Sequence, residues 1–151
     1  MSNVRAGNAN LFFLEKGSGV PIIFVHGIPT DYRVWDAQLE VFSRNFRAIT
    51  YSRRYAFPNK REGNVSDSTV ENNSGDLIAL IEELGLRTVN LVGHSFGGFV
   101  AIYTAWKRPD LLKNLVLIEP AIPSMLVRNE KNPFETLWFL LTNPTTAFSA
   151  R

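Results

Sequence analysis

The sequence predicts an α/β fold in which a mostly parallel sheet carries helices on both faces. Short apolar runs rich in β-branched residues alternate along the chain with longer segments whose apolar residues recur at helical spacing. The apolar runs are continuous, as expected for strands that are buried on both faces of a parallel sheet. Alternation of the two patterns favours crossover connections, and therefore layers of helix on sheet.

The expected elements of the first part are an edge hairpin strand at 11–15, a buried strand at 21–25, a helix capped by Asp31, a strand at 47–51 and a loop at 52–65. The hairpin strand ends at a Gly-Ser-Gly turn, and the buried strand is an unbroken apolar run. The helix repeats apolar residues at helical spacing, whereas the loop is polar and contains proline and glycine.

The second part begins with a capping box, in which Ser68 is followed three residues later by Glu71. The helix behind it presents one apolar face and stops at Gly85. The remaining expected elements are a strand at 88–92, a helix at 99–106 and a further buried strand at 115–118.

Composition places the chain among ordinary globular proteins. Its 151 residues are 45% hydrophobic and 20% charged, which is unlike a disordered or fibrous protein. The net charge is +2, and we interpret the small basic clusters at 53–54 and 60–61 as solvated loop charges, so we expect no nucleic-acid partner. The absence of cysteine excludes disulfides and thiolate metal sites.

Two further features favour a cytoplasmic location without membrane contact. Residues 1–10 are polar and lack the apolar core of a signal peptide. The apolar stretch at 137–141 is far too short to span a bilayer.

The motif Gly93-His94-Ser95-Phe96-Gly97 stands between a predicted strand and a predicted helix. A Gly-x-Ser-x-Gly pattern in that position is a nucleophile elbow. Its sharp turn strains the serine backbone, so the residues two positions away need little or no side chain. The serine hydroxyl is thereby exposed at a helix N-terminus, where the N–H groups favour developing negative charge.

Together with the His26-Gly27-Ile28 turn after the strand at 21–25, this elbow makes the chain resemble the alpha/beta-hydrolase superfamily. The resemblance is greatest to its esterase, lactonase, cofactor-free haloperoxidase and epoxide-hydrolase-like branches. The segments that carry it are 26–30, 51–55, 93–98 and 115–120. It implies that residues 1–123 form the N-terminal part of an alpha/beta-hydrolase domain without its C-terminal strands and helices, and that 124–151 begin a lid or cap.

The resemblance also implies a chemistry. Ser95 would be the nucleophile, and the backbone N–H groups of Phe96 and Ile28, beside Gly27, would form the oxyanion hole. Relatives transfer an acyl group to the serine and then hydrolyse the acyl-enzyme, so we expect a small-molecule ester, lactone or similar acyl substrate and neither cofactor nor metal.

The catalytic histidine of the family lies late in the chain, whereas this sequence has only His26 and His94. We expect both to be structural, since a general base must reach the serine hydroxyl directly. Glu119, at the end of the strand at 115–118, is a candidate for the acid that orients the histidine. The alternative for Glu119 is a carboxylate that caps an element or contacts the lid.

Three aromatic residues, Phe134, Trp138 and Phe139, are candidates for an acyl pocket; alternatively they pack a lid helix on the core or form an exposed patch. Two functions remain open from the sequence. The first is a serine hydrolase represented by its N-terminal half. The second is a non-catalytic relative that binds a ligand or partner. We expect the isolated chain to be marginally stable, to self-associate, or to depend on a second polypeptide that carries the acid and the histidine.

Overall fold

The structure is a computed structural model that describes residues 2–6, 9–59 and 67–121. Contacts divide the chain into two units, Met1–Pro120 and Ala121–Arg151, and the description below concerns the first. The expected lid segment, 124–151, lies outside the described residues. In the part of the chain that is described, no helix has the length and apolar character needed to cross a membrane.

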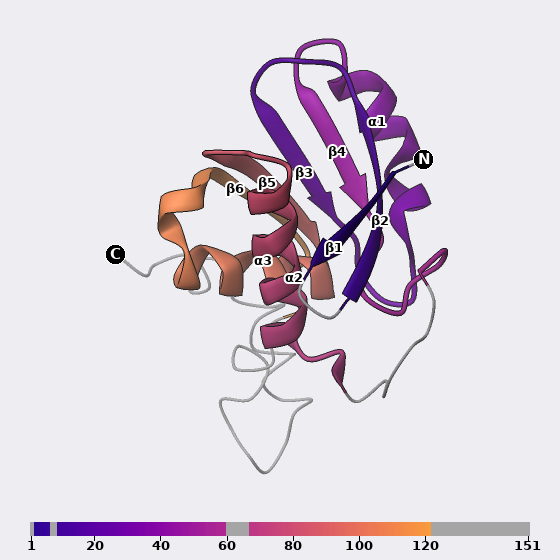
Figure 1. The fold of residues 1–151 in the computed structure, drawn as a ribbon, viewed down its shortest axis with the longest axis vertical. Coiled ribbons are helices and arrows are strands. Elements are labelled where there is room, and N and C mark those ends of the chain that lie inside the picture. Colours follow the sequence, from indigo (N-terminus) through magenta and orange to yellow (C-terminus); the bar gives the residue numbers. More distant parts are fainter. Residues whose placement is uncertain (1, 7–8, 60–66, 122–151) are drawn as a thin grey trace, which may run out of the picture. The chain divides into compact units, whose positions relative to one another are not determined.

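A six-stranded sheet of order β1-β2-β4-β3-β5-β6 forms the centre of the unit (Figure 1). Its strands are β1 (Ser2–Ala6), β2 (Ala9–Lys16), β3 (Pro21–Val25), β4 (Arg47–Tyr51), β5 (Val89–His94) and β6 (Leu112–Ile118). The four strands from β4 to β6 in this order pair in parallel, whereas β1, β2 and β4 pair antiparallel. The expected α/β fold with a mostly parallel sheet is confirmed.

The first strands correct the sequence prediction. β2 is not an edge strand, because β1 pairs with it on one side and β4 on the other. β1 escaped prediction because most of its residues are exposed and polar, so that it shows no apolar pattern. The hairpin of this region is therefore β1–β2.

Helices cover both faces of the sheet, as the sequence predicted (Figure 1). They are η1 (Tyr32–Trp35), α1 (Asp36–Phe42), α2 (Val70–Glu83), α3 (Phe96–Lys107) and η3 (Pro109–Leu111). On one face Trp35 and Leu39 pack on Phe24 of β3. On the other face α2 and α3 bury Leu77 and Val100 against the central strands. Asp31 is the N-cap of η1, since its carboxylate accepts a hydrogen bond from the Arg33 N–H.

The beginning of α2 differs from the expected capping box. Thr69, not Ser68, is the N-cap, and its hydroxyl accepts a hydrogen bond from the Asn72 N–H at 3.2 Å. The Ser68 hydroxyl instead accepts a hydrogen bond from the Asn73 side chain. Two adjacent hydroxyl residues precede the helix, and the sequence alone did not distinguish which one caps it.

The strand at 115–118 is also less buried than predicted. It belongs to β6, which has one neighbour, β5, in the described sheet. Val116 and Ile118 are accordingly 50% and 40% exposed.

Candidate active site

Ser95 stands at the junction of β5 and α3, as the elbow motif predicted. Its backbone has φ 52° and ψ −123°, a left-handed conformation that costs energy for any residue with a side chain. The Ser95 N–H donates to the Ile118 carbonyl oxygen at 2.9 Å, which ties the turn to β6. The Ser95 side chain makes no capping hydrogen bond to α3, although the residue is the N-cap.

The glycines of the motif are required by close backbone approach. A Cβ atom on Gly93 would lie 2.6 Å from the Gly97 carbonyl oxygen. A Cβ atom on Gly97 would lie 2.3 Å from the Val25 carbonyl oxygen and 2.5 Å from that of His26. The first turn of α3 therefore sits directly on the end of β3.

The turn after β3 lies beside the elbow. Val25 pairs with Gly93 in the parallel ladder, so the residues that follow leave the same edge of the sheet. A Cβ atom on Gly27 would lie 2.9 Å from the Cβ of Ser95 and 3.3 Å from Nδ1 of His94. The structure thus brings the two motifs together from positions almost seventy residues apart.

The Gly27 carbonyl oxygen accepts an unusual number of hydrogen bonds. Its donors are Nδ1 of His26 at 2.8 Å, Nη2 of Arg53 at 3.0 Å, and the Oγ1 and N–H groups of Thr30 at 3.0 and 3.4 Å. The peptide bond between Gly27 and Ile28 is trans, so its C=O and N–H groups point in opposite directions. Holding the carbonyl inward therefore turns the Ile28 N–H away from the buried donors.

His26 is fully buried and both of its ring nitrogens are engaged. Nε2 accepts a hydrogen bond from the Arg53 N–H at 3.0 Å, so in the neutral ring the proton is on Nδ1, which donates to Gly27. Burial, followed by the positive charge of Arg53, lowers the pKa of His26 to about 4. A neutral, fully bonded ring has no nitrogen free to act as a base for Ser95.

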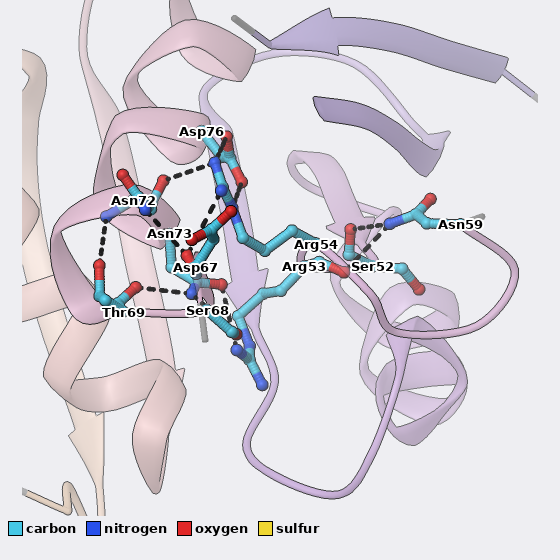
Figure 2. A network of polar contacts seen from close by, with 10 residues as sticks. All are labelled: Ser52, Arg53, Arg54, Asn59, Asp67, Ser68, Thr69, Asn72, Asn73 and Asp76. Atoms are coloured by element: carbon cyan, nitrogen blue, oxygen red, sulfur yellow. Dashed lines mark hydrogen bonds and ion pairs between the residues drawn. The ribbon is translucent and has the colours of Figure 1, made fainter. Parts of the chain in front are cut away.

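Arg53 and Arg54 overturn the interpretation of this pair as solvated loop charges. Both are buried, at 4% and 8% exposure, because partners from distant segments surround them. Figure 2 shows the two side chains reaching α2, where Arg54 forms a bidentate ion pair with Asp76 and Arg53 donates to the Asn73 side chain. Arg53 also donates to the His26 carbonyl oxygen at 2.8 Å.

The loop that carries these arginines is itself held in place. The Asn59 side chain donates to the Ser52 and Arg53 carbonyl oxygens and accepts from the Phe12 N–H of β2. The Arg53 guanidinium lies 4.9 Å from the centre of the Phe96 ring. Sequence reasoning missed Arg53, although its place two residues after β4, which is parallel to β3, puts it at the same sheet edge as the His26-Gly27 turn.

Glu119 follows β6 in a left-handed conformation, with φ 45°, and is exposed. Since His94 pairs with Ile118, the backbone of Glu119 lies at the same edge of the sheet as Ser95. The candidate pocket residues Phe134, Trp138 and Phe139 lie outside the described residues. Within the described ranges no group of three or more His, Cys, Asp or Glu side chains could hold a metal ion.

Comparison with known proteins agrees with this geometry. The sequence model of the family described as "alpha/beta hydrolase fold" matches residues 20–150. The chain belongs to this family. The "Non-heme haloperoxidase" of Rhodococcus erythropolis is 38% identical over 82% of the chain and 44% of its own length. "Epoxide hydrolase 2" of Siraitia grosvenorii is 33% identical over 76% of the chain and 37% of its own length.

Solved structures of an esterase and an epoxide hydrolase are similar as well. A thermophilic esterase from Thermogutta terrifontis matches with a TM-score of 0.73 and 32% identity, over 80% of this chain and 46% of its own. An epoxide hydrolase from Vigna radiata matches with a TM-score of 0.74 and 31% identity, over 77% and 37%. The chain thus spans less than half of the length of these relatives.

Proposed function

We propose that this alpha/beta hydrolase chain supplies the nucleophile and oxyanion hole of a serine hydrolase that acts on esters, lactones or similar acyl substrates. The observation that carries the proposal is the position of Ser95. Ser95 has a left-handed backbone conformation at the N-terminus of α3 and lies next to Gly27. Its hydroxyl makes no capping hydrogen bond to the helix.

The proposed reaction has two stages. The Ser95 oxygen attacks the substrate carbonyl carbon while its proton passes to a general base, and the carbonyl oxygen becomes an oxyanion that accepts hydrogen bonds from the N–H groups of Ile28 and Phe96. The leaving alcohol departs with a proton, and an ester on Ser95 remains. Water then attacks this ester, which releases the acid and restores the serine.

A serine at this position favours acyl substrates over epoxides. The relatives include proteins named as epoxide hydrolases and an esterase, so the family alone does not decide the substrate. Opening an epoxide with a serine hydroxyl would leave an alkyl ether on the enzyme, and water does not readily cleave an ether. An acyl group would instead leave an ester, which water hydrolyses.

The base is proposed to come from outside the described residues. His26 is occupied at both nitrogens, and no hydrogen bond joins His94 to Ser95 in the described part of the chain. Glu119 is retained as a proposed acid that would orient the histidine. Cytoplasmic location and completion by a second polypeptide or by self-association stay predictions.

A fluorophosphonate probe tests the nucleophile. In the complete natural protein we expect the probe to label Ser95, and Ser95→Ala to abolish both labelling and ester turnover. Ser43→Ala is a matched control, because the Ser43 hydroxyl donates to the Glu40 carbonyl oxygen, far from the elbow in sequence. Absence of labelling in the folded wild-type protein would favour the non-catalytic binding role instead.

A further inference from the structure

We infer that Arg53 is a positioning residue for the oxyanion hole, and this inference rests on the proposed function. A single buried side chain contacts Phe96, which supplies one proposed donor, and the Gly27–Ile28 peptide unit, which carries the other. Its guanidinium donates to the Gly27 carbonyl oxygen, which shares a peptide unit with the Ile28 N–H, and lies against the ring of Phe96.

The contacts of Arg53 hold the guanidinium at one place. Nε donates to the His26 carbonyl oxygen at 2.8 Å, Nη2 to the Gly27 carbonyl oxygen at 3.0 Å, and Nη1 to Oδ1 of Asn73 at 3.1 Å. The three acceptors lie in the turn after β3 and in α2, and the bonds use the planar fork of donors that arginine has and lysine lacks. The side chain therefore connects the turn after β3 rigidly to α2.

In the part of the chain that the structure describes, no carboxylate neutralises the charge of Arg53. Among the described residues its acceptors are two carbonyl oxygens and an amide oxygen, and none of its bonds goes to a carboxylate. Arg54, one residue later, instead forms an ion pair with Asp76 at 2.7 Å. A buried cation without a carboxylate partner is costly, so its charge must be offset by the carbonyl dipoles that it orients.

This arrangement has two effects on the Gly27–Ile28 peptide. The hydrogen bond from Arg53 fixes the carbonyl direction and hence the direction of the Ile28 N–H. It also polarises the peptide, because a charged donor withdraws electron density from the carbonyl and makes the N–H group a stronger donor. Both effects favour an oxyanion over a neutral carbonyl, so they act in the transition state.

Three variants test this role. Arg53→Met keeps most of the apolar stem without donors or charge, and Arg53→Lys keeps the charge without the fork. The control is Arg54→Met combined with Asp76→Asn, which removes the neighbouring buried arginine and the charge of its partner without touching Gly27. All are made in the complete protein, and kcat is expressed per site labelled by fluorophosphonate, so that loss of folded protein does not count as loss of catalysis.

For Arg53→Met we expect kcat to fall by ~10- to 100-fold with KM within about twofold, short of the ~10²–10³-fold cost of deleting an oxyanion donor. Affinity for a trifluoromethyl ketone, which forms a tetrahedral oxyanion adduct on the serine, should fall in parallel with kcat. Arg53→Lys should lose at least about threefold in kcat, and the control double variant should change kcat by less than about twofold.

The outcomes separate this inference from the proposed function. If Ser95 is labelled and turns over ester, but kcat in Arg53→Lys and Arg53→Met stays at the wild-type value, the role of Arg53 is refuted while the nucleophile stands. A fall in kcat that the control shows equally would also refute it. If Arg53→Met does not fold, the lysine variant decides. If wild-type Ser95 is not labelled at all, the proposed function fails first.

Discussion

A Cβ atom on Gly27 would lie 2.9 Å from the Cβ of Ser95, although Gly27 follows β3 and Ser95 follows β5. No pair of real Cβ atoms tolerates this distance, so the two residues can coexist only while position 27 has no side chain. The relation makes the turn after β3 and the elbow one structural unit.

Gly27→Ala is therefore expected to reduce ester turnover by at least about tenfold, since the new methyl group must displace either Ser95 or the oxyanion turn. Gly75→Ala in α2 is the matched control. A Cβ atom there would meet nothing within 4 Å, and alanine should stabilise the helix by up to about 1 kcal/mol without affecting turnover. Equal activity of the Gly27→Ala variant and the wild type, measured with a nitrophenyl ester, would contradict the close approach.

The buried imidazole of His26 predicts a pH-dependent free energy of unfolding. Burial lowers its pKa in the folded protein to about 4 from the ordinary value of 6.5. Between these two values the unfolded chain binds a proton that the folded protein excludes. The contribution of the neutral His26 ring to the free energy of unfolding is therefore complete above pH 6.5. As pH falls from 6.5 to 4, the free energy of unfolding decreases by up to about 3 kcal/mol.

Urea unfolding at a series of pH values measures this effect. His26→Gln removes the titrating ring, so it should unfold more easily than the wild type at pH 7 but lose less stability between pH 6.5 and 4. Parallel pH profiles for the two proteins would show that His26 titrates normally.

Thr30 offers a milder change at the same carbonyl. Its hydroxyl donates to the Gly27 oxygen at 3.0 Å, and the residue is exposed, so substitution leaves the core intact. Thr30→Val should lower kcat several-fold with an unchanged KM, while Thr30→Ser, which keeps the donor, should retain wild-type kcat. Steady-state kinetics of the two variants would decide, and an equal loss in both would point to packing rather than to the hydrogen bond.

The ion pair between Arg54 and Asp76 is buried, with side chains 7% and 4% exposed. Asp76→Ala would leave the Arg54 charge buried without its partner, and we expect this to cost about 3–5 kcal/mol in the free energy of unfolding. Glu82→Gln, which breaks an exposed pair with Arg108, should change stability little. Denaturant unfolding compares the two, and similar losses would show that burial of Asp76 does not matter.

Much of this architecture was predictable because it depends on local patterns. The unbroken apolar run of β3 predicts a buried strand, and a Gly-x-Ser-x-Gly motif between a strand and a helix predicts a sharp turn at the serine. The structure agrees with both predictions. The burial of Arg53 was not predictable, since its acceptors at Gly27 and Asn73 lie 26 residues before it and 20 residues after it in the sequence. The polar composition of the loop does not show which of the charged side chains in it will bind acceptors from distant segments.

The sequence analysis missed β1 and the Thr69 N-cap for a different reason. An exposed strand of mostly polar residues leaves no periodic signal, and its pairing depends on β2 alone. Adjacent Ser68 and Thr69 are both good N-cap residues, so residue type does not distinguish them, and the structure has Thr69 as the cap.

The Ile28 side chain is 60% exposed, whereas the carbonyl that orients its peptide is held by four hydrogen bonds. The orientation of the Ile28 N–H therefore does not depend on the Ile28 side chain. Under the proposed function, an engineer seeking new acyl preferences could place any residue except proline, which lacks an N–H, at position 28 and keep the oxyanion donor. At position 27 we expect every residue other than glycine to reduce activity, because its Cβ atom would lie too close to Ser95. Two adjacent positions therefore differ strongly in how much sequence variation selection can accept.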